Sequence, residues 1–320
     1  MQRSETSTHR FGRTIALLAA ALSACSSVAQ VQQAQSQARI YDVHARRFVT
    51  EATLVAGLVH ARYRLLGEIH DDPAHHAIRA RLITEIAGNG VHPAVVLEQF
   101  DLDHDAALQA AQRAGADAEH VATAGALDRK GWAWPLHEPI VAAALAMHLP
   151  LRAGNLSRTA LSGDPDALLR GDEAWRTRLH AVHWTDAQAA ELRRDIVDSH
   201  CHMLPEAVVP RLVLAQRVRD AAMAQALVDD ATADGAILIA GNGHVRADLG
   251  VPVYLHAPGL ADADARSIGV GFLEINDDDE RAGDFPRRVI AANPGFDYVW
   301  LTPAIARPDP CAAFRSAPKG

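Results

Sequence analysis

The sequence has no run of lysine and arginine in the body of the chain, no internal repeat and, beyond its first residues, no apolar stretch long enough to span a membrane. Its formal net charge is −8. A protein that binds nucleic acid is expected to show a basic patch, so nucleic acid is not an expected partner. The HExxH spacing typical of zinc metalloproteases is also missing.

Histidine, by contrast, is abundant for an acidic chain, with 17 residues. Imidazole is the side chain used most for metal ligation and for proton transfer near neutral pH, although many of these histidines are expected to be ordinary surface residues. Hydrophobic residues make up 49% of the 320 positions, so the chain can bury a sizeable core. This length suits one large domain, or one domain with a subdomain.

The first 24 residues have the features of an export signal. Three arginines precede the apolar run "TIALLAAALSA" at 14–24, which is too short to cross a membrane as an ordinary helix. The run ends in "LSAC", which looks like a bacterial lipobox, with cleavage before Cys25 and lipidation of its thiol. The following residue, Ser26, is not aspartate, which favours the outer membrane, on its periplasmic side. A plain signal peptide with a coincidental cysteine is the alternative.

The rest of the chain divides by composition. Residues 25–38 are rich in Gln, Ser and Ala and are expected to form a flexible tether. We expect an α/β domain over 39–310, with a helical insertion at about 157–234, and a tail at 311–320. Two of the three cysteines, Cys201 and Cys311, fall in the exported part, where they form a disulfide or remain free thiols.

Strand and helix signals alternate along the domain. Helices are expected at 72–87, 103–114 and 137–148. Short apolar runs rich in β-branched residues predict strands at 63–69, 93–100, 149–155, 235–242, 251–257, 267–275 and 297–303. Such buried strands separated by helices predict an α/β fold with a mostly parallel sheet flanked by helices, and the segment without strand signals predicts a helical insertion subdomain.

Four successive expected strands end in polar residues. Glu68 and His70 close the first strand, Glu98 the second and Asn155 the third, and His244 follows the fourth. In an open parallel sheet the ligand crevice lies beyond the carboxyl ends of the strands. If these strands are parallel, the five side chains converge on one edge of the sheet and form a candidate site.

Each of these residues also has a local alternative. Residues two apart on an extended segment face the same side, so Glu68 and His70 suit a ligand pair, or a base and the group that orients it. Glu98 could instead form a buried structural salt bridge. Asp72 is expected to cap the following helix, while His75 and His76 are expected to lie solvated on its first turn.

Two further polar clusters are candidates. In "DSHCHMLPE", His200 and His202 flank a cysteine, and the next helix carries a polar stripe at 216, 219, 220 and 223 that includes Arg219. The stripe either lines a pocket or packs the insertion against the domain. In "GWAWPLHEPI", Trp132 and Trp134 lie close to His137 and form either an aromatic wall for a flat ligand or a corner of the core.

Together these motifs resemble one family, the ChaN-like haem-binding lipoproteins of bacterial iron uptake, which are grouped with the Tiki-type metalloproteases and the erythromycin esterases. The resemblance runs from about Arg39 to Pro303. It rests on seven motifs in the family's order, which are "LLGEIHDDPAHH", "VVLEQF", "GWAWPLHEPI", "LPLRAGNLSR", "SHCHMLPE", "AQRVRDAAMA" and "AGNGHVRADLGVPVYL".

The resemblance implies haem, iron protoporphyrin IX, as the ligand, and a role in haem iron uptake at the envelope. Two departures from the family bear on the iron ligand. Tyrosine is common where this chain has His137, so either His137, Tyr63 or another residue is the ligand, or haem binding is weakened. Glycine is common where it has His202, which adds a further candidate. A homodimer and an outer-membrane haem receptor or transport protein are the protein partners that the resemblance leaves open.

The leading hypothesis is therefore an envelope-anchored haem-binding lipoprotein without catalytic activity. The alternative is a metal-dependent hydrolase, an esterase or protease of the same superfamily. In that case Glu68, His70, Glu98 and His244 are the expected catalytic residues, and the last three are the expected ligands of a divalent metal. An envelope protein with a vestigial crevice is a third, weaker hypothesis.

Overall fold

The computed structural model describes residues 39–162, 167, 169–170, 173–276, 295–309 and 311–312. The predicted signal peptide and tether at 1–38, which include Cys25, lie outside these residues, as does most of the predicted tail. In the described part of the chain, no helix has both the length and the apolar character that a membrane crossing requires.

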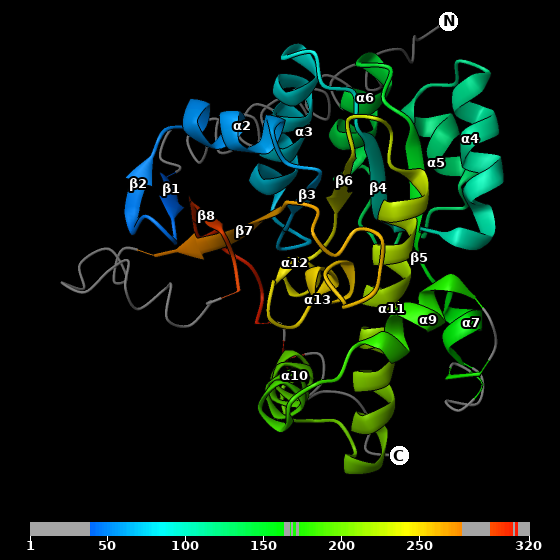
Figure 1. The fold of residues 1–320 in the computed structure, drawn as a ribbon, viewed down its shortest axis with the longest axis vertical. Coiled ribbons are helices and arrows are strands. Elements are labelled where there is room, and N and C mark those ends of the chain that lie inside the picture. Colours follow the sequence, from blue (N-terminus) through cyan, green and yellow to red (C-terminus); the bar gives the residue numbers. More distant parts are fainter. Residues whose placement is uncertain are drawn as a thin grey trace, which may run out of the picture.

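The strands form one eight-stranded sheet in the order β2-β1-β8-β7-β3-β6-β4-β5 (Figure 1). From β8 to β5 every neighbouring pair is parallel, whereas β1 pairs antiparallel with β2 and with β8. The strands are β1 (Arg39–Asp42), β2 (Arg47–Val49), β3 (Tyr63–Leu66), β4 (Ala94–Asp101), β5 (Leu151–Asn155), β6 (Ala236–Ile239), β7 (Ser267–Ile275) and β8 (Tyr298–Pro303). The predicted α/β fold with a mostly parallel sheet is confirmed.

Helices cover both faces of the sheet, and each face has its own apolar core. On one face lie α2 (Glu51–Val59), α3 (Pro73–Gly88), α4 (Asp105–Arg113), α5 (Ala118–Ala124) and α6 (Glu138–Ala146). On the other lie α9 (Ala174–Ala181), α11 (Val209–Asp230), α12 (Asn242–Val245) and α13 (Val251–Leu255). This two-sided cover explains why the central strands are apolar on both faces.

The predicted insertion is helical throughout its described regular elements, as expected. It contains α7 (Arg158–Ser162), α9, α10 (Asp186–Ser199) and α11. Figure 1 shows α10 and the start of α11 extending beyond the sheet, while the rest of α11 runs back along it. Met223 and Leu227 of α11 are fully buried in the same core as Leu65 and Leu238 of the sheet. The last helix of the insertion is therefore also a covering helix of the α/β domain.

One expected strand is wrong, and two short strands were not expected. The run "VPVYLHA" at 251–257 forms helix α13 rather than a strand, and Pro252 lies in its first turn, where proline is well tolerated. Strands β1 and β2, four and three residues long, have no counterpart among the expected strands. The apolar run at 251–257 is too short for periodicity to separate a buried strand from a buried helix.

Candidate functional site

The carboxylate of Glu68 is the centre of a buried polar cluster at the carboxyl end of β3. The residue is only 2% exposed. Its Oε1 accepts a hydrogen bond from Nδ1 of His70 at 2.5 Å and lies 3.2 Å from Nε2 of His137 and 3.3 Å from the Gln99 amide nitrogen. At Gly67, which directly follows β3, a Cβ atom would lie 2.3 Å from the Asn242 side-chain oxygen and 3.0 Å from the Val270 backbone oxygen, so glycine fits there.

Helix α3 adds His76 and Arg79 to this cluster. Both side chains are buried, and the guanidinium of Arg79 forms an ion pair with Oε2 of Glu68. Arg79 also donates to Nδ1 of His76 at 2.9 Å, and Nε2 of His76 donates to the backbone oxygen of His70 at 2.9 Å. Burial lowers the pKa of His76 to about 3, which agrees with a neutral ring that accepts on one nitrogen and donates from the other.

The expectation that His75 and His76 are solvated is therefore wrong. His75 is fully buried, where its Nδ1 accepts from the backbone N–H of Ile69 at 3.1 Å and its Nε2 lies 2.9 Å from the Thr302 hydroxyl. The expected cap is confirmed, because Asp72 accepts from the N–H of Ala74 at the start of α3. The first turn of α3 packs against the sheet edge instead of facing solvent.

His70 is the member of the cluster that reaches the surface. Its side chain is 51% exposed, and its ring centre lies 5.1 Å from that of Trp132 in an edge-on arrangement. Because Nδ1 donates to Glu68, Nε2 is the nitrogen that carries the lone pair. A Cβ atom at Gly241 would lie 2.9 Å from Nε2, so a glycine there lets the ring rest against the backbone.

A second cluster, formed by Glu98, Asp220 and His244, lies next to the first. His244 is held between the two carboxylates, with Nδ1 2.6 Å from Asp220 and Nε2 3.2 Å from Glu98. The backbone N–H of Gly241 donates to Glu98 at 2.8 Å. Asp220 belongs to the polar stripe on α11, so this residue of the stripe is buried against His244 at the carboxyl edge of the sheet.

Charge governs the protonation of the second cluster. Burial opposes a charged imidazole, but the attraction of Glu98 and Asp220 outweighs it and raises the pKa of His244 to about 10. Burial likewise disfavours ionised Glu98, yet His244 and the Gly241 N–H lower the pKa of Glu98 to about 2. Burial dominates at Asp220 and raises its pKa to about 6. At neutral pH, His244 is an imidazolium held by carboxylates.

The aromatic segment before α6 divides between the site and the surface. His137 is buried, and both of its ring nitrogens are engaged, since Nδ1 lies 3.0 Å from the Trp132 backbone oxygen and Nε2 faces Glu68. Trp132 contacts the rings of both His70 and His137. Trp134 instead donates to Glu119 of α5 at 2.8 Å. Trp132 is thus the tryptophan that packs on the Glu68 cluster.

Other predicted residues lie elsewhere. Tyr63 begins β3, at the end of the strand opposite Glu68, and its side chain is fully buried in the core. Asn155 ends β5, where its side-chain oxygen accepts from the following backbone N–H. Arg219 lies on α11 beside Asp220.

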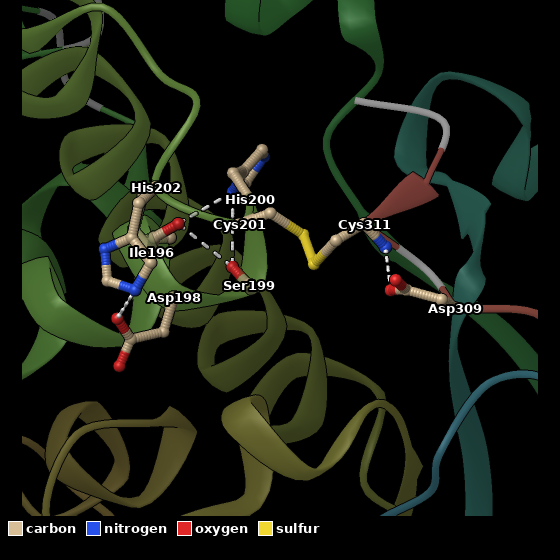
Figure 2. The surroundings of a disulfide bond; sticks show 8 residues. All are labelled: Ile196, Asp198, Ser199, His200, Cys201, His202, Asp309 and Cys311. Carbon is tan, nitrogen blue, oxygen red and sulfur yellow. Dashed lines mark hydrogen bonds and ion pairs between the residues drawn. A yellow bond between two sulfur atoms is a disulfide. The ribbon is translucent and has the colours of Figure 1, made fainter. Parts of the chain in front are cut away.

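His200 and His202 flank a disulfide. Cys201, at the end of α10, is bonded to Cys311 of the C-terminal segment, with a Cα–Cα distance of 5.6 Å (Figure 2). His200 lies against the last turn of α10, and the exposed ring of His202 pairs with Asp198 at 3.2 Å. The disulfide, one of the two states that the sequence left open, joins the insertion to the C-terminal segment.

Three ligand atoms in the first cluster could hold a metal ion. Atoms of Glu68, His70 and His137 lie within 4.8 Å of one another. The ion pair between Arg79 and Glu68 counts against a divalent cation here, because a buried guanidinium already neutralises that carboxylate. The metal ligands predicted from the sequence are His70, Glu98 and His244. Glu98 and His244 form an ion pair with each other in the structure.

A family model described as haem-binding uptake, Tiki superfamily, ChaN matches residues 54–255, more than half of the chain. The chain belongs to this family. The resemblance read from the seven motifs is thereby confirmed. The match covers the strands and helices that supply both polar clusters, from the helix before β3 to α13. No curated protein sequence matches the chain.

Two solved structures are similar to the family member described here. A structure described as cofacial heme binding to ChaN of Campylobacter jejuni is 21% identical, covers 83% of this chain and 97% of that one, and superposes with a TM-score of 0.65. The type III effector HopBA1 is 14% identical over 69% of this chain and 81% of its own, with a TM-score of 0.37. The first match shows that the fold is shared, while the second is too distant to carry an argument.

Proposed function

We propose that the protein binds haem at the carboxyl edge of the sheet, with Nε2 of His70 as the axial ligand of the iron. The observation that carries this proposal is the exposed imidazole of His70, whose Nδ1 donates to buried Glu68 at 2.5 Å. Metal-binding histidines almost always donate their other ring nitrogen to a carboxylate or carbonyl, which fixes the tautomer and the orientation of the ring. Histidine is a common axial ligand of haem iron.

The surroundings of His70 support the same ligand. Trp132 offers an aromatic surface 5.1 Å from the imidazole, which suits a flat apolar macrocycle. His137 would have to leave its buried position between the Trp132 backbone oxygen and Glu68 to reach an iron atom. The side chain of His70, by contrast, is half exposed, and its Nδ1 can keep the hydrogen bond to Glu68 when Nε2 binds iron. Membership of a haem-binding family agrees with this assignment.

The proposal predicts a saturable change in the Soret band when hemin is added to the apo-protein. With a single tight site, the Soret absorbance at micromolar concentrations rises linearly with added hemin and then levels off at a fixed ratio of hemin to protein. Albumin-free buffer and a titration into buffer alone control for hemin aggregation. If the spectrum never departs from that of free hemin, the protein does not bind haem at this site.

A divalent metal site with hydrolytic activity is a second candidate, because Glu68, His70 and His137 bring three ligand atoms within 4.8 Å. In that case the protein purified without chelator holds stoichiometric metal, and Glu68→Gln abolishes hydrolysis of an ester or peptide while hemin still binds. Metal below one atom in ten chains, together with a hemin-dependent Soret band, favours the haem site instead.

We also propose that Cys25 anchors the protein to the outer membrane, on its periplasmic side, where it takes part in haem iron uptake. The apolar run at 14–24 followed by "LSAC" supports this, because multiple acyl chains hold a protein stably on a bilayer. Wild-type protein is expected to incorporate labelled fatty acid and to fractionate with membranes, whereas Cys25→Ser does neither. An unlabelled wild type in the soluble fraction would rule out the anchor.

A further inference from the structure

The chain that follows β8 connects the sheet to the helical insertion. The backbone N–H of Ala304 donates to the Ile275 oxygen at 2.9 Å, so this segment starts beside the carboxyl end of β7. Further on, Cys311 is bonded to Cys201 at the end of α10 (Figure 2). Residues 304–309 and Cys311 therefore form a strap, which is attached to the sheet at one end and covalently to the insertion at the other.

Arg307, in the middle of the strap, binds the residue that follows His70. Its guanidinium donates two hydrogen bonds to Asp71, both 3.0 Å long, and two more to Glu274 of β7, at 2.5 and 2.7 Å. Paired hydrogen bonds of this kind fix the relative geometry of the groups as well as adding energy. The side chain of Asp71 is 58% exposed, whereas that of Glu274 is largely buried. Arg307 therefore ties the loop of His70 to β7.

Helix α10, to which the strap is bonded, is itself fixed to the second polar cluster. Arg246 lies two residues after His244, and its guanidinium pairs with Glu191 and Asp195 of α10, the latter at 3.0 Å. The guanidinium is only 12% exposed. The helix therefore gives Cys311 a fixed point of attachment.

We propose that the strap positions His70 for haem binding, with Arg307 as the positioning residue, and that the disulfide between Cys201 and Cys311 holds the strap in place. The inference rests on the proposed haem site. An exposed ion pair contributes little by itself, because holding two flexible side chains together costs entropy. A strap attached at both ends lowers this cost, because it keeps the guanidinium at a high effective concentration beside Asp71.

Haem affinity is then coupled to the redox state of the disulfide. Both cysteines are partly exposed, so a dithiol reductant can reach them. The S–S bond breaks, two electrons and two protons pass from the dithiol to the cysteines, and the dithiol becomes a disulfide. The strap then keeps only its attachment to the sheet and its ion pairs. Couplings between two sites are typically 5- to 150-fold, and bound hemin must oppose reduction of the disulfide by the same factor.

The contact at Asp71 is tested by Soret titration of paired variants. Arg307→Gln and Asp71→Asn are each expected to weaken hemin binding about fivefold, and the double variant no more than either one, because both act through one contact. Arg307→Lys keeps the charge and should restore part of the affinity. Arg152→Gln is the matched control, since Arg152 of β5 pairs with Asp230 at 2.8 Å and is 21% exposed, against 26% for Arg307. It should bind hemin as the wild type does.

The disulfide is tested with the double variant Cys201→Ser and Cys311→Ser. It is expected to bind hemin at least about fivefold more weakly than the oxidised wild type. Wild-type protein reduced with a phosphine, and freed of it by anaerobic gel filtration, should match this variant. Adding Arg307→Gln to the serine variant should cost little further affinity, because the open strap no longer holds the guanidinium at Asp71.

The inference is overturned if Arg307→Gln or the serine variant binds hemin as tightly as the wild type, or if their losses multiply in full when they are combined. An equal loss in Arg152→Gln would show a general effect on stability and would overturn it too. Each of these results leaves the haem site itself intact. A wild-type protein that gives no saturable Soret change removes the proposed function, and the role of the strap with it.

Discussion

Replacing His244 with alanine is expected to lower the free energy of unfolding by about 3–5 kcal/mol, because it leaves Glu98 and Asp220 buried without a counter-charge. The imidazolium lies 2.6 Å from one carboxylate and 3.2 Å from the other, and all three side chains are nearly inaccessible to solvent. Removing one member of a buried ionic cluster costs more than the cluster contributes, since the remaining charges keep their desolvation penalty. Urea unfolding with linear extrapolation measures the loss.

This loss should depend on pH. The pKa of His244 is raised from 6.5 to about 10, so its contribution to stability is complete below about pH 6.5 and disappears as the pH rises toward 10. The pKa of Glu98 is lowered from 4.5 to about 2, so its contribution is complete above about pH 4.5 and is lost at lower pH. The difference between wild type and His244→Ala is therefore expected to be largest between about pH 4.5 and 6.5.

A matched control is His202→Ala, which removes an exposed imidazole with a surface ion pair. Its effect should stay within about 0.5 kcal/mol at every pH. A difference for His244→Ala that is below about 1 kcal/mol, or that does not vary with pH, would show that the cluster is not the buried ionic unit described above.

The convergence of the strand ends could be predicted because it follows from chain direction alone. In a parallel sheet, Glu68, Glu98 and His244 must reach the same edge whatever the details of packing, and the structure brings all three there with His70. The family could also be read from the motifs, since seven short segments in one order are more specific than any single motif.

The buried residues that pair with Glu68 and His244 could not be predicted, because these contacts depend on packing between elements far apart in sequence. His76 and Arg79 lie three residues apart on α3 and so share a face, but the chain does not show that this face meets the edge of β3. For the same reason the sequence could place Asp220 on a polar stripe of its helix but could not show that this carboxylate pairs with His244. Tyr63 was a candidate by residue type, whereas its position at the amino end of β3 takes it into the core.

Removing the imidazole of His70 is expected to weaken hemin binding by more than about 100-fold, because even outer partners of a metal ligand cost 10–100-fold when they are lost. Glu68→Gln should fall within that 10–100-fold range, because it keeps the shape but loses the charge that orients His70. Affinities from Soret titrations at a single pH give both values, and His202→Gly, away from the cluster, should bind as the wild type does.

The most direct test of the haem site is chemical rescue of His70→Gly. The variant is expected to show no saturable Soret change at hemin concentrations that saturate the wild type, and added imidazole should restore a wild-type-like band that co-elutes with the protein in gel filtration. Free hemin with imidazole gives the background spectrum. Hemin binding by His70→Gly with wild-type affinity and an unchanged Soret band, in the absence of imidazole, would contradict iron ligation by His70.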